Sequence, residues 1–527
     1  MPNKNRDTFA APGLLAAPPA AKSKQSPNIG FERVEVQAMR KKWQLIDDCL
    51  AGSDQIKAAG DRYLPRPNAA DTSEANKARF NNYVLRAVFY NVGHVTVEGM
   101  VGQVFSRDPI MKLPPEMKSM VEDVDGTGVS LDQQSRSGLI QNVTRGGFGL
   151  LVDYPVTAGP LTLAQRQEGY IRPTITQYNR LSIINWRFKK VGAKQLFSLV
   201  VIHESTSGTD DGFEVTTVEQ WRVLQLDAAG EYTVTTYARA EGDEGYVATS
   251  ETVKPKGADG MPMRYIPFYF CGALNNSPSP DVPIIYNLCT LNIAHYRNSA
   301  DYEDSCYIAG QPTPVFAGLT EQWVNRVFKN KTIQMGARAA IPLPQGATAQ
   351  ILQASPNSMP KEAMDQKEKQ MAAMGAKLIE PGSGTNTLGQ AQLDESTESS
   401  MLSVAAKNVS LAYTLALIES AKQQGLPVEE INYSLNTDFP ASRLTPNERT
   451  QVILEWQACA ISETEMRAAL RKAGVATLDE VEYKADLLKN PPPAAKEATN
   501  NQDKGGADNT PTKNKDANNN GGNQAQT

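Results

Sequence analysis

Apolar residues recur at helical spacing in the first part of the chain. Val34, Leu45 and Cys49 belong to a run with this period, which predicts a helix that ends at Gly52. A second run, residues 74–103, has the same spacing and predicts one long helix that bends at its glycines. The first hundred residues are therefore expected to be helical.

The middle of the chain changes to the composition and alternation of strands. An amphipathic helix is predicted first, at residues 131–143. Ala229–Gly230 lies between two strand-like runs and indicates a hairpin turn. The predicted strands are residues 148–154, 196–202, 217–226, 232–237 and 266–271. A β-rich insert, residues 170–275, thus interrupts a mostly helical chain.

Helical patterning returns after Pro283 and surrounds a small mixed segment. One helix is predicted to reach Tyr307, with Asp281 as a nearby cap and Gly310 as its end. A further helix, residues 361–379, places its methionines on one stripe. Prolines divide the segment between these helices, whose predicted elements are strands at 313–316, 339–343 and 348–353 and a helix at 323–328.

A glycine-rich loop and a fourth long helix follow. Residues 381–389 have the composition of a flexible loop. Residues 394–424 predict a helix that Gly425 ends.

Two shorter helices are predicted between residues 430 and 490. Thr445 precedes Pro446 and is the expected cap of one, while Ser462 and Glu465 form the capping box of the other. Residues 491–527 contain no aromatic residue and no Val, Ile, Leu or Met, so we expect this tail to be disordered. The same expectation holds for residues 1–30.

Composition narrows the class of protein. The chain has 527 residues, which corresponds to roughly three domains. Its 53 basic and 58 acidic side chains give a net charge of −5, and the 40% hydrophobic content is enough for a packed core. A negative balance argues against a protein that coats DNA non-specifically, but not against one that lets DNA slide past.

Several other classes are disfavoured. No apolar run approaches the roughly 20 residues of a membrane span, and residues 14–17 are too short for a signal-peptide core, so we expect a protein made and kept in a cytosol. The five cysteines form no CxxC pair, and no histidine has a metal-ligand partner at i+4, which disfavours zinc enzymes and histidine-based nucleophilic catalysts. These residues are Cys49, Cys271, Cys289, Cys306, Cys459, His94, His203 and His295.

A glycine motif at residues 145–149 invites comparison with phosphate-binding loops. It lacks the Gly-Lys-Ser/Thr ending that would place a lysine and a hydroxyl on the phosphates, and it precedes a strand rather than a helix. A helix-to-strand turn that needs a permissive backbone is the favoured interpretation.

A carboxylate cluster, Asp301, Glu303 and Asp304, lies near Tyr302 in a predicted helix. Carboxylates that converge in a pocket would serve a metal or acid–base site. A solvated helix end is the favoured alternative.

Two basic groups have structural and functional interpretations. The lysines of the helix at 361–379 alternate with acidic residues, which is typical of an exposed face but also of a surface in weak contact with a phosphate backbone. A basic-aromatic group in the proline-rich segment is either a binding surface or the filling of a small core. The residues are Lys361, Lys367, Lys369 and Lys377 in the first group and Trp323, Arg326, Lys329 and Lys331 in the second.

The order of these elements resembles that of the tailed-bacteriophage portal proteins, the head-to-tail connectors with portal-like domains. The resemblance covers residues 31–490. Three stretches carry it: residues 43–52 with 63–65; residues 266–270 with the helix at 284–306 and Gly310–Gln311–Pro312; and residues 438–440 with 444–445 and 461–464.

The resemblance implies an α+β portal fold with wing, stem, clip and crown, in which long stem helices flank a small α/β clip and the β-rich insert lies in the wing. The implied divisions are a disordered arm at 1–30, the wing at 31–282, the first stem helix at 283–308, the clip at 309–356, the second stem helix at 357–380, the tunnel loop at 381–393, the long wing helix at 394–428, the crown at 429–490 and a disordered tail at 491–527.

The resemblance also implies a function without catalysis, cofactor or metal. Portal proteins form dodecameric rings at one capsid vertex, through which the terminase packages double-stranded DNA and through which the DNA is later ejected. The implied partners are the terminase large subunit, the major capsid and scaffold proteins, and the head-completion, adaptor and tail proteins, with no membrane. The implied location is the virion, and the host cytoplasm during assembly.

The resemblance assigns roles to particular residues. The stem lysines Lys361, Lys367, Lys369 and Lys377 become candidates for facing DNA, and Trp323, Arg326, Lys329 and Lys331 become candidates for contact with the terminase or an adaptor. The tunnel loop would narrow the channel with Gly382, Ser383, Gly384, Thr385, Asn386, Thr387 and Gly389.

Two alternatives remain at this point. One is another structural virion protein, such as an adaptor or minor capsid protein. The other is a metal-dependent nuclease that uses Asp301, Glu303 and Asp304.

Overall fold

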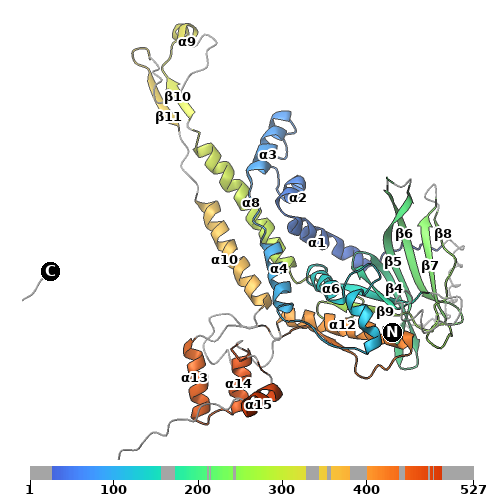
Figure 1. The fold of residues 1–527 in the computed structure, drawn as a ribbon. Coiled ribbons are helices and arrows are strands. Elements are labelled where there is room, and N and C mark those ends of the chain that lie inside the picture. Colours follow the sequence, from blue (N-terminus) through green and yellow to red (C-terminus); the bar gives the residue numbers. More distant parts are fainter. Residues whose placement is uncertain are drawn as a thin grey trace, which may run out of the picture. The chain divides into compact units, whose positions relative to one another are not determined.

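A computed structural model describes residues 27–155, 172–210, 213, 215–240, 245–311, 313–327, 343–352, 358–379, 400–437, 439, 446–472, 475–476, 478 and 480–489. The chain divides into two units, Met1–Ala441 and Ser442–Thr527. In the first unit a run of helices is followed by a run of strands and then by further helices, and the described part of the second unit is helical. The fold is α+β, as the sequence predicts (Figure 1).

The main core of the first unit lies between helices and a small sheet. Strand β2 (Gly147–Asp153) pairs with both β3 (Thr174–Asn179) and β9 (Phe268–Gly272). Helices α6 (Leu131–Arg145) and α12 (Met401–Gln424) pack on this sheet. Buried Phe148, Tyr413 and Tyr433 join the layers through aromatic contacts.

The remaining helices of this unit surround that core. Val101 of α4 and Ile46 of α1 are fully buried in it. The elements are α1 (Val34–Ala51), α2 (Ser53–Ala58), η1 (Gly60–Arg62), α3 (Glu74–Arg86), α4 (Val92–Val104), η2 (Pro115–Met117) and α5 (Lys118–Glu122).

A second, larger sheet is antiparallel throughout and has the order β4-β5-β6-β7-β8. One of its faces packs Trp186 and Val200 against Trp43 and Phe270. Its strands are β4 (Ile183–Val191), β5 (Lys194–Asp210), β6 (Val215–Leu226), β7 (Tyr232–Arg239) and β8 (Tyr246–Ala248). The expected hairpin at Ala229–Gly230 is confirmed, since β6 and β7 pair from Leu226↔Tyr232 onward. The predicted β-rich insert therefore consists of two sheets, because its last strand, β9, pairs with β2 instead.

Two long helices of this unit flank a small insert. They are α8 (Tyr286–Ala309) and α10 (Met359–Ile379). Between them lie β10 (Thr313–Ala317), α9 (Glu321–Val327) and β11 (Thr348–Leu352), and the two strands pair with each other. The predicted strand at 339–343 lies almost wholly outside the described residues.

The prediction of a single helix over residues 74–103 was wrong. The chain leaves helical geometry at Ala87 and resumes it at Val92. The hydroxyl of Ser299 accepts a hydrogen bond from the Val88 N–H at 3.1 Å and donates one to the Val88 carbonyl at 2.7 Å. Phe89 is buried in this gap and packs edge-on against Tyr296. Packing of Val88 and Phe89 against α8 therefore determines where the helix breaks. The glycines of α4 do not lie at this break.

Two predicted helix starts also differ. Asp281 does not cap α8, because its carboxylate accepts the N–H of Leu274 at 2.8 Å and Ile285 occupies the N-cap position. The fourth long helix begins at Met401, where Ser400 accepts the Ser403 N–H. Gly425 ends this helix in the left-handed region, as predicted.

Among the described residues, one helix is long and apolar enough to cross a membrane, namely α12. The sequence predicts no such segment. Leu402, Val409 and Leu417 of this helix are fully buried against the main core. Its apolar character is that of a core helix.

The second unit contains three described helices: α13 (Pro446–Gln457), α14 (Glu463–Lys472) and α15 (Glu480–Lys489). The capping box is confirmed, because the Glu465 N–H donates to Ser462 Oγ and the Ser462 N–H donates to the Glu465 carboxylate. Helix α15 was not predicted. It contacts α14 through Tyr483, which donates to Glu463 at 3.0 Å and lies under Arg467.

Strand β12 (Asn432–Ser434) belongs to the first unit, where it pairs with β1 (Ile110–Lys112).

Candidate functional site

The helix pair α8–α10, with the insert that it carries, is the candidate site. Helix α8 starts in the main core, where Ile284 and Ile285 are buried and the Ile284 N–H donates to the carbonyl of Val143. The glycine turn at Gly146–Gly147 makes this docking possible, because Gly146 lies against the carbonyl of Asp281. Helix α10 packs along α8, and both helices end at the insert (Figure 1).

The seam between the two helices contains a polar contact between a buried imidazole and a half-exposed carboxylate. His295 of α8 has a side chain that is 3% exposed, and its Nε2 lies 3.2 Å from Oε1 of Glu368 on α10. Met371 of α10 is also buried in the seam. The predicted methionine stripe is thus confirmed as the side of α10 that meets α8, with Met364 and Met374 half-buried.

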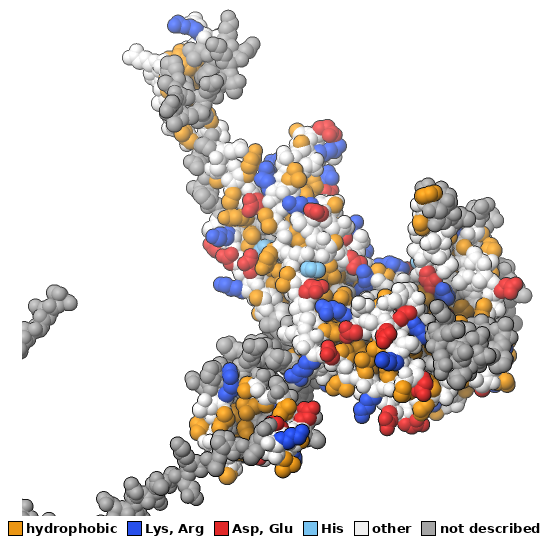
Figure 2. Space-filling model, viewed as in Figure 1, with side chains coloured by type: hydrophobic (Ala, Val, Ile, Leu, Met, Phe, Trp, Pro, Cys, Tyr) orange, Lys and Arg blue, Asp and Glu red, His pale blue; other side chains and the backbone are white. Residues whose placement is uncertain are grey.

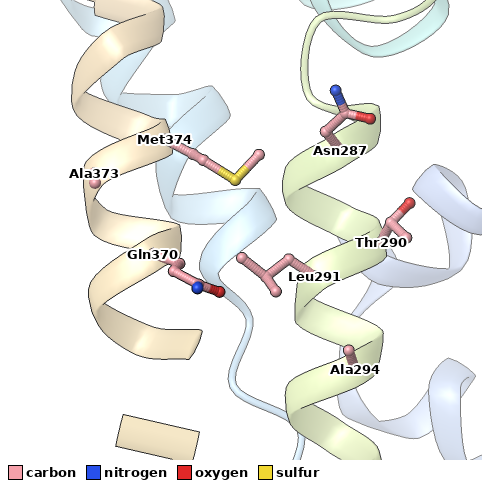
Figure 3. Close-up of a pocket in the computed structure, with 7 residues that line it drawn as sticks. All are labelled: Asn287, Thr290, Leu291, Ala294, Gln370, Ala373 and Met374. Atoms are coloured by element: carbon pink, nitrogen blue, oxygen red, sulfur yellow. The ribbon is translucent and has the colours of Figure 1, made fainter. Parts of the chain in front are cut away.

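Next to the seam lies an open groove of about 530 Å³. Leu291 of α8 and Met374 of α10 extend toward each other across it, and Gln370 of α10 lies beside them (Figure 3). The other lining residues are Asn287, Thr290, Ala294 and Ala373. The lining is mostly apolar and has no charged side chain, so it favours contact with an apolar surface.

The insert leaves much of its surface uncovered within one chain. All five side chains of β11 are exposed, and Ile351 and Leu352 are 63% and 67% exposed. Trp323 of α9 is half-buried and Arg326 is exposed. The other two members of the basic-aromatic group, Lys329 and Lys331, lie outside the described residues, so this group of four stays a prediction.

The four stem lysines do not share one side of α10. At about 100° of rotation per residue, Lys361 and Lys369 lie about 80° apart, whereas Lys367 points to another side of the helix. Lys361 and Lys369 are exposed, and Lys367 bends back to the carbonyl of Ala363. The side chain of Lys377 is not described. Apolar and charged side chains are mixed along this helix pair (Figure 2).

The predicted tunnel loop lies outside the described residues, which stop at 379 and resume at 400. Its residues Gly382, Ser383, Gly384, Thr385, Asn386, Thr387 and Gly389 therefore remain predictions.

The favoured interpretation, a solvated helix end, is wrong for Asp304, whereas Asp301 is exposed. Asp304 pairs with Arg86 of α3 at 2.6 Å, and its side chain is only 16% exposed. Asp301 accepts a hydrogen bond from Tyr83. Burial, together with this hydrogen bond, raises the pKa of Tyr83 above its ordinary value. In the part of the chain that the structure describes, no three His, Cys, Asp or Glu side chains are grouped to hold a metal ion.

A buried carboxylate in α12 was not among the residues predicted from the sequence. Glu419 is 1% exposed and accepts hydrogen bonds from the hydroxyls of Tyr265 at 2.6 Å and Tyr269 at 3.2 Å. On the same helix, Asn408 donates to the carbonyl of Gly272 at 2.9 Å. The sequence did contain a signal for these contacts: Glu419 and Asn408 are polar residues on an apolar face of α12, which indicates that each has a polar partner. These bonds hold β9 against α12, directly before the chain enters α8.

Comparisons with known proteins give distant matches. Residues 284–422 match the family described as "Domain of unknown function (DUF4055)", which is less than half of the chain. This match begins before α8 and ends within α12, so it spans the candidate site. No curated protein matches the chain.

Solved structures show low similarity. The chain is 14% identical to a protein of the neck of a native GTA particle computed with C12 symmetry, with a TM-score of 0.37, over 72% of this chain and 89% of that chain. A protein of the virion of a native gene transfer agent particle is also 14% identical, with a TM-score of 0.36, over 80% of this chain and 99% of that chain. At these values the similarity does not define a function.

Proposed function

We propose that this chain is a structural virion protein, and specifically a bacteriophage portal protein that forms a ring at one capsid vertex. In this proposal DNA passes through the ring during packaging and ejection, and the chain has no catalytic role. The order of the elements supports it: α8, the insert, α10, the glycine-rich residues 381–393 and α12 follow one another as stem, clip, stem, tunnel loop and long wing helix.

The observation that carries the proposal is the construction of the α8–α10 pair. Helix α8 is fixed in the main core at its start. In helix α10, by contrast, Met371 is the only buried side chain among those that the structure describes. The described part of the insert at the end of the helix pair consists of a two-stranded ladder and a short helix. An isolated two-stranded ladder is marginally stable in water, so exposed strand β11 is suited to being covered by a neighbouring molecule. A ring of copies supplies such neighbours at every position.

The charges agree with a channel that does not hold DNA tightly. Each lysine or arginine that neutralises a phosphate adds a salt-dependent contact, and many such contacts would slow translocation. Helix α10 alternates Lys361 and Lys369 with acidic residues, and the net charge of the chain is −5. We assign weak DNA contact to the exposed lysines and the channel constriction to residues 381–393.

The partners follow from the same proposal. The insert at 309–356, with Trp323 and Arg326, would contact the terminase large subunit during packaging and the head-completion or adaptor proteins afterwards. The capsid and scaffold proteins would contact other surfaces of the ring. The proposed number of subunits is twelve.

The test is negative-stain electron microscopy combined with mass measurement on the purified full-length protein. We expect rings with a central channel wide enough for double-stranded DNA. A stable small oligomer without a channel would contradict the portal proposal and favour an adaptor or minor capsid protein. Divalent-cation-dependent cleavage of DNA that Asp304→Ala abolishes would instead favour a nuclease.

A further inference from the structure

The hairpin between β4 and β5 projects beyond the other strands of the larger sheet. Strand β5 pairs with β6 only from Leu199 onward. Residues 188–191 and 194–197 pair with each other, and neither segment pairs with any other described strand. We name residues 187–197 the ribbon. Its tip, at Gly192 and Ala193, is exposed, so the ribbon is open to a partner.

The ribbon is basic throughout. Its sequence contains four cationic side chains and no acidic one. All four are exposed, and none forms an ion pair within the described part of the chain; they are Arg187, Lys189, Lys190 and Lys194.

Three of these cations lie on one face of the ribbon. Side chains alternate between the two faces along a strand, and directly opposite residues share a face. Arg187 and Lys189 are two residues apart on β4, and Lys194 is opposite Val191, the next residue of the same face. Neighbouring cations in this row are therefore about 7 Å apart.

The other face of the ribbon is attached to the core by aromatic packing. Phe188 and Phe197 stack with their ring centroids 4.6 Å apart, and Phe197 packs on Phe270 of β9 at 5.3 Å. Phe270 is buried. The row of cations is thus presented by a supported two-stranded element rather than by a loop.

The acidic residues at the same end of the sheet already have partners. The turn between β6 and β7 contains Asp227 and Glu231, and both carboxylates pair with Lys254, at 2.9 and 2.7 Å. Near the base of the ribbon, Glu35 pairs with Arg33 at 2.8 Å. The charge of the ribbon is therefore left for an anion outside the chain.

A row of unpaired cations fits a polyanion with closely spaced charges. Duplex DNA carries one phosphate per roughly 3.4 Å of each strand, so cations about 7 Å apart reach several phosphates at once. The major groove of B-DNA also admits a two-stranded β-ribbon. Contacts to phosphates fix a protein on the duplex but do not read its sequence.

We propose that the ribbon binds the phosphate backbone of duplex DNA, without sequence preference, through Arg187, Lys189 and Lys194. This inference goes beyond the proposed function, because it assigns a DNA contact to the larger sheet rather than to α10 or residues 381–393. It also requires neither a ring nor a channel.

The test is the salt dependence of binding to a fluorescently labelled duplex of about 20 base pairs, measured by anisotropy with the full-length protein. Each phosphate contact contributes about 0.9 to the slope of log affinity against log salt concentration. We expect Lys189→Gln/Lys194→Gln to decrease this slope by about 2 and to weaken binding by at least about tenfold at 50 mM salt. Two duplexes of different sequence should bind equally well.

Matched variants separate the ribbon from general effects of charge. Lys112→Gln/Lys118→Gln removes the same charge from exposed positions elsewhere and should bind like the wild type. Lys189→Arg/Lys194→Arg keeps the charge and should retain the affinity. Equal thermal midpoints of all variants exclude misfolding as the cause.

Other results overturn the inference. An unchanged slope and affinity in Lys189→Gln/Lys194→Gln would exclude the ribbon as a DNA contact. A loss confined to Lys361→Gln/Lys369→Gln would assign the binding to α10 instead. Weaker self-association of the ribbon variant in sedimentation velocity, with duplex binding unchanged, would assign the ribbon to an acidic protein surface. Electron microscopy of rings tests the proposed function separately from each of these results.

Discussion

His295 of α8 and Glu368 of α10 meet across the seam of the helix pair, with imidazole Nε2 3.2 Å from carboxylate Oε1. The imidazole is buried, whereas the carboxylate is about half exposed. The contact therefore connects a helix that is fixed in the core to one that is otherwise largely uncovered.

We expect Glu368→Ala to lower the free energy of unfolding by about 1 kcal/mol, because the buried imidazole loses a hydrogen-bond partner and the exposed carboxylate is well solvated. Urea denaturation followed by circular dichroism measures this. Gln366→Ala, at an exposed position of the same helix, is the matched control and should have little effect. Equal losses in both variants would show that helix propensity, rather than the contact, is responsible.

Glu419→Ala should be more destabilising, by about 2–4 kcal/mol, because it leaves the hydroxyls of Tyr265 and Tyr269 without their acceptor in a buried site. Thermal and urea denaturation measure the loss. Lys422→Ala, at an exposed position of the same helix, should change stability by less than about 0.5 kcal/mol. A loss below about 1 kcal/mol for Glu419→Ala would mean that the carboxylate is not needed to hold β9 against α12.

Arg86→Ala should destabilise the contact between α3 and α8 by about 1–2 kcal/mol, since Arg86 pairs with the largely buried Asp304. Arg79 gives a matched control, because it lies 3.9 Å from the same carboxylate and is 62% exposed. Arg79→Ala should cost less than about 0.5 kcal/mol. Hydrogen exchange of α3 measures the local effect, and similar protection in the two variants would contradict the assignment.

Gly147→Ala should prevent normal folding of the first unit. Gly147 has φ 143°, and an added Cβ would lie 2.3 Å from the carbonyl oxygen of Cys271 in the neighbouring strand. Gly99→Ala is the control, because nothing lies near its added Cβ and alanine favours a helix by about 1 kcal/mol over glycine. Soluble yield and the urea midpoint distinguish the two. A stable Gly147→Ala protein in which β2 still pairs with β9 would contradict this close approach of the two strands.

The stability of the first unit should fall as the pH rises above about 10. Burial raises the pKa of Tyr178, Tyr232 and Tyr269 above the ordinary value. Above pH 10 the unfolded chain loses these phenolic protons while the folded chain retains them, so the unfolded state binds fewer protons and stability decreases. Below pH 10 this contribution is fully present.

Urea midpoints between pH 8 and 11 test this prediction. Tyr232→Phe removes one buried phenol and should make the decline less steep. Tyr90→Phe, at a position that is 58% exposed, is the control and should leave it unchanged. A constant urea midpoint up to pH 11 would show that these phenols do not resist ionisation in the folded protein.

The sequence by itself determined the elements whose signals are local. The capping box at Ser462, the left-handed glycine after α12, the hairpin at Ala229–Gly230 and the methionine stripe of α10 all depend on residues that are close together in the chain. The same is true of the glycine turn at residues 146–147. Such signals act through backbone conformation and side-chain periodicity, which do not need the rest of the fold.

Only the tertiary structure decided the features that depend on distant partners. The break between α3 and α4 is set by Ser299, which lies 211 residues from Val88. Asp301 and Asp304 of α8 pair with Tyr83 and Arg86 of α3. His295 contacts Glu368, which lies 73 residues further along the chain. A polar side chain in a helix has the same local pattern whether it faces solvent or a buried partner, and packing between the helices determines which of the two occurs.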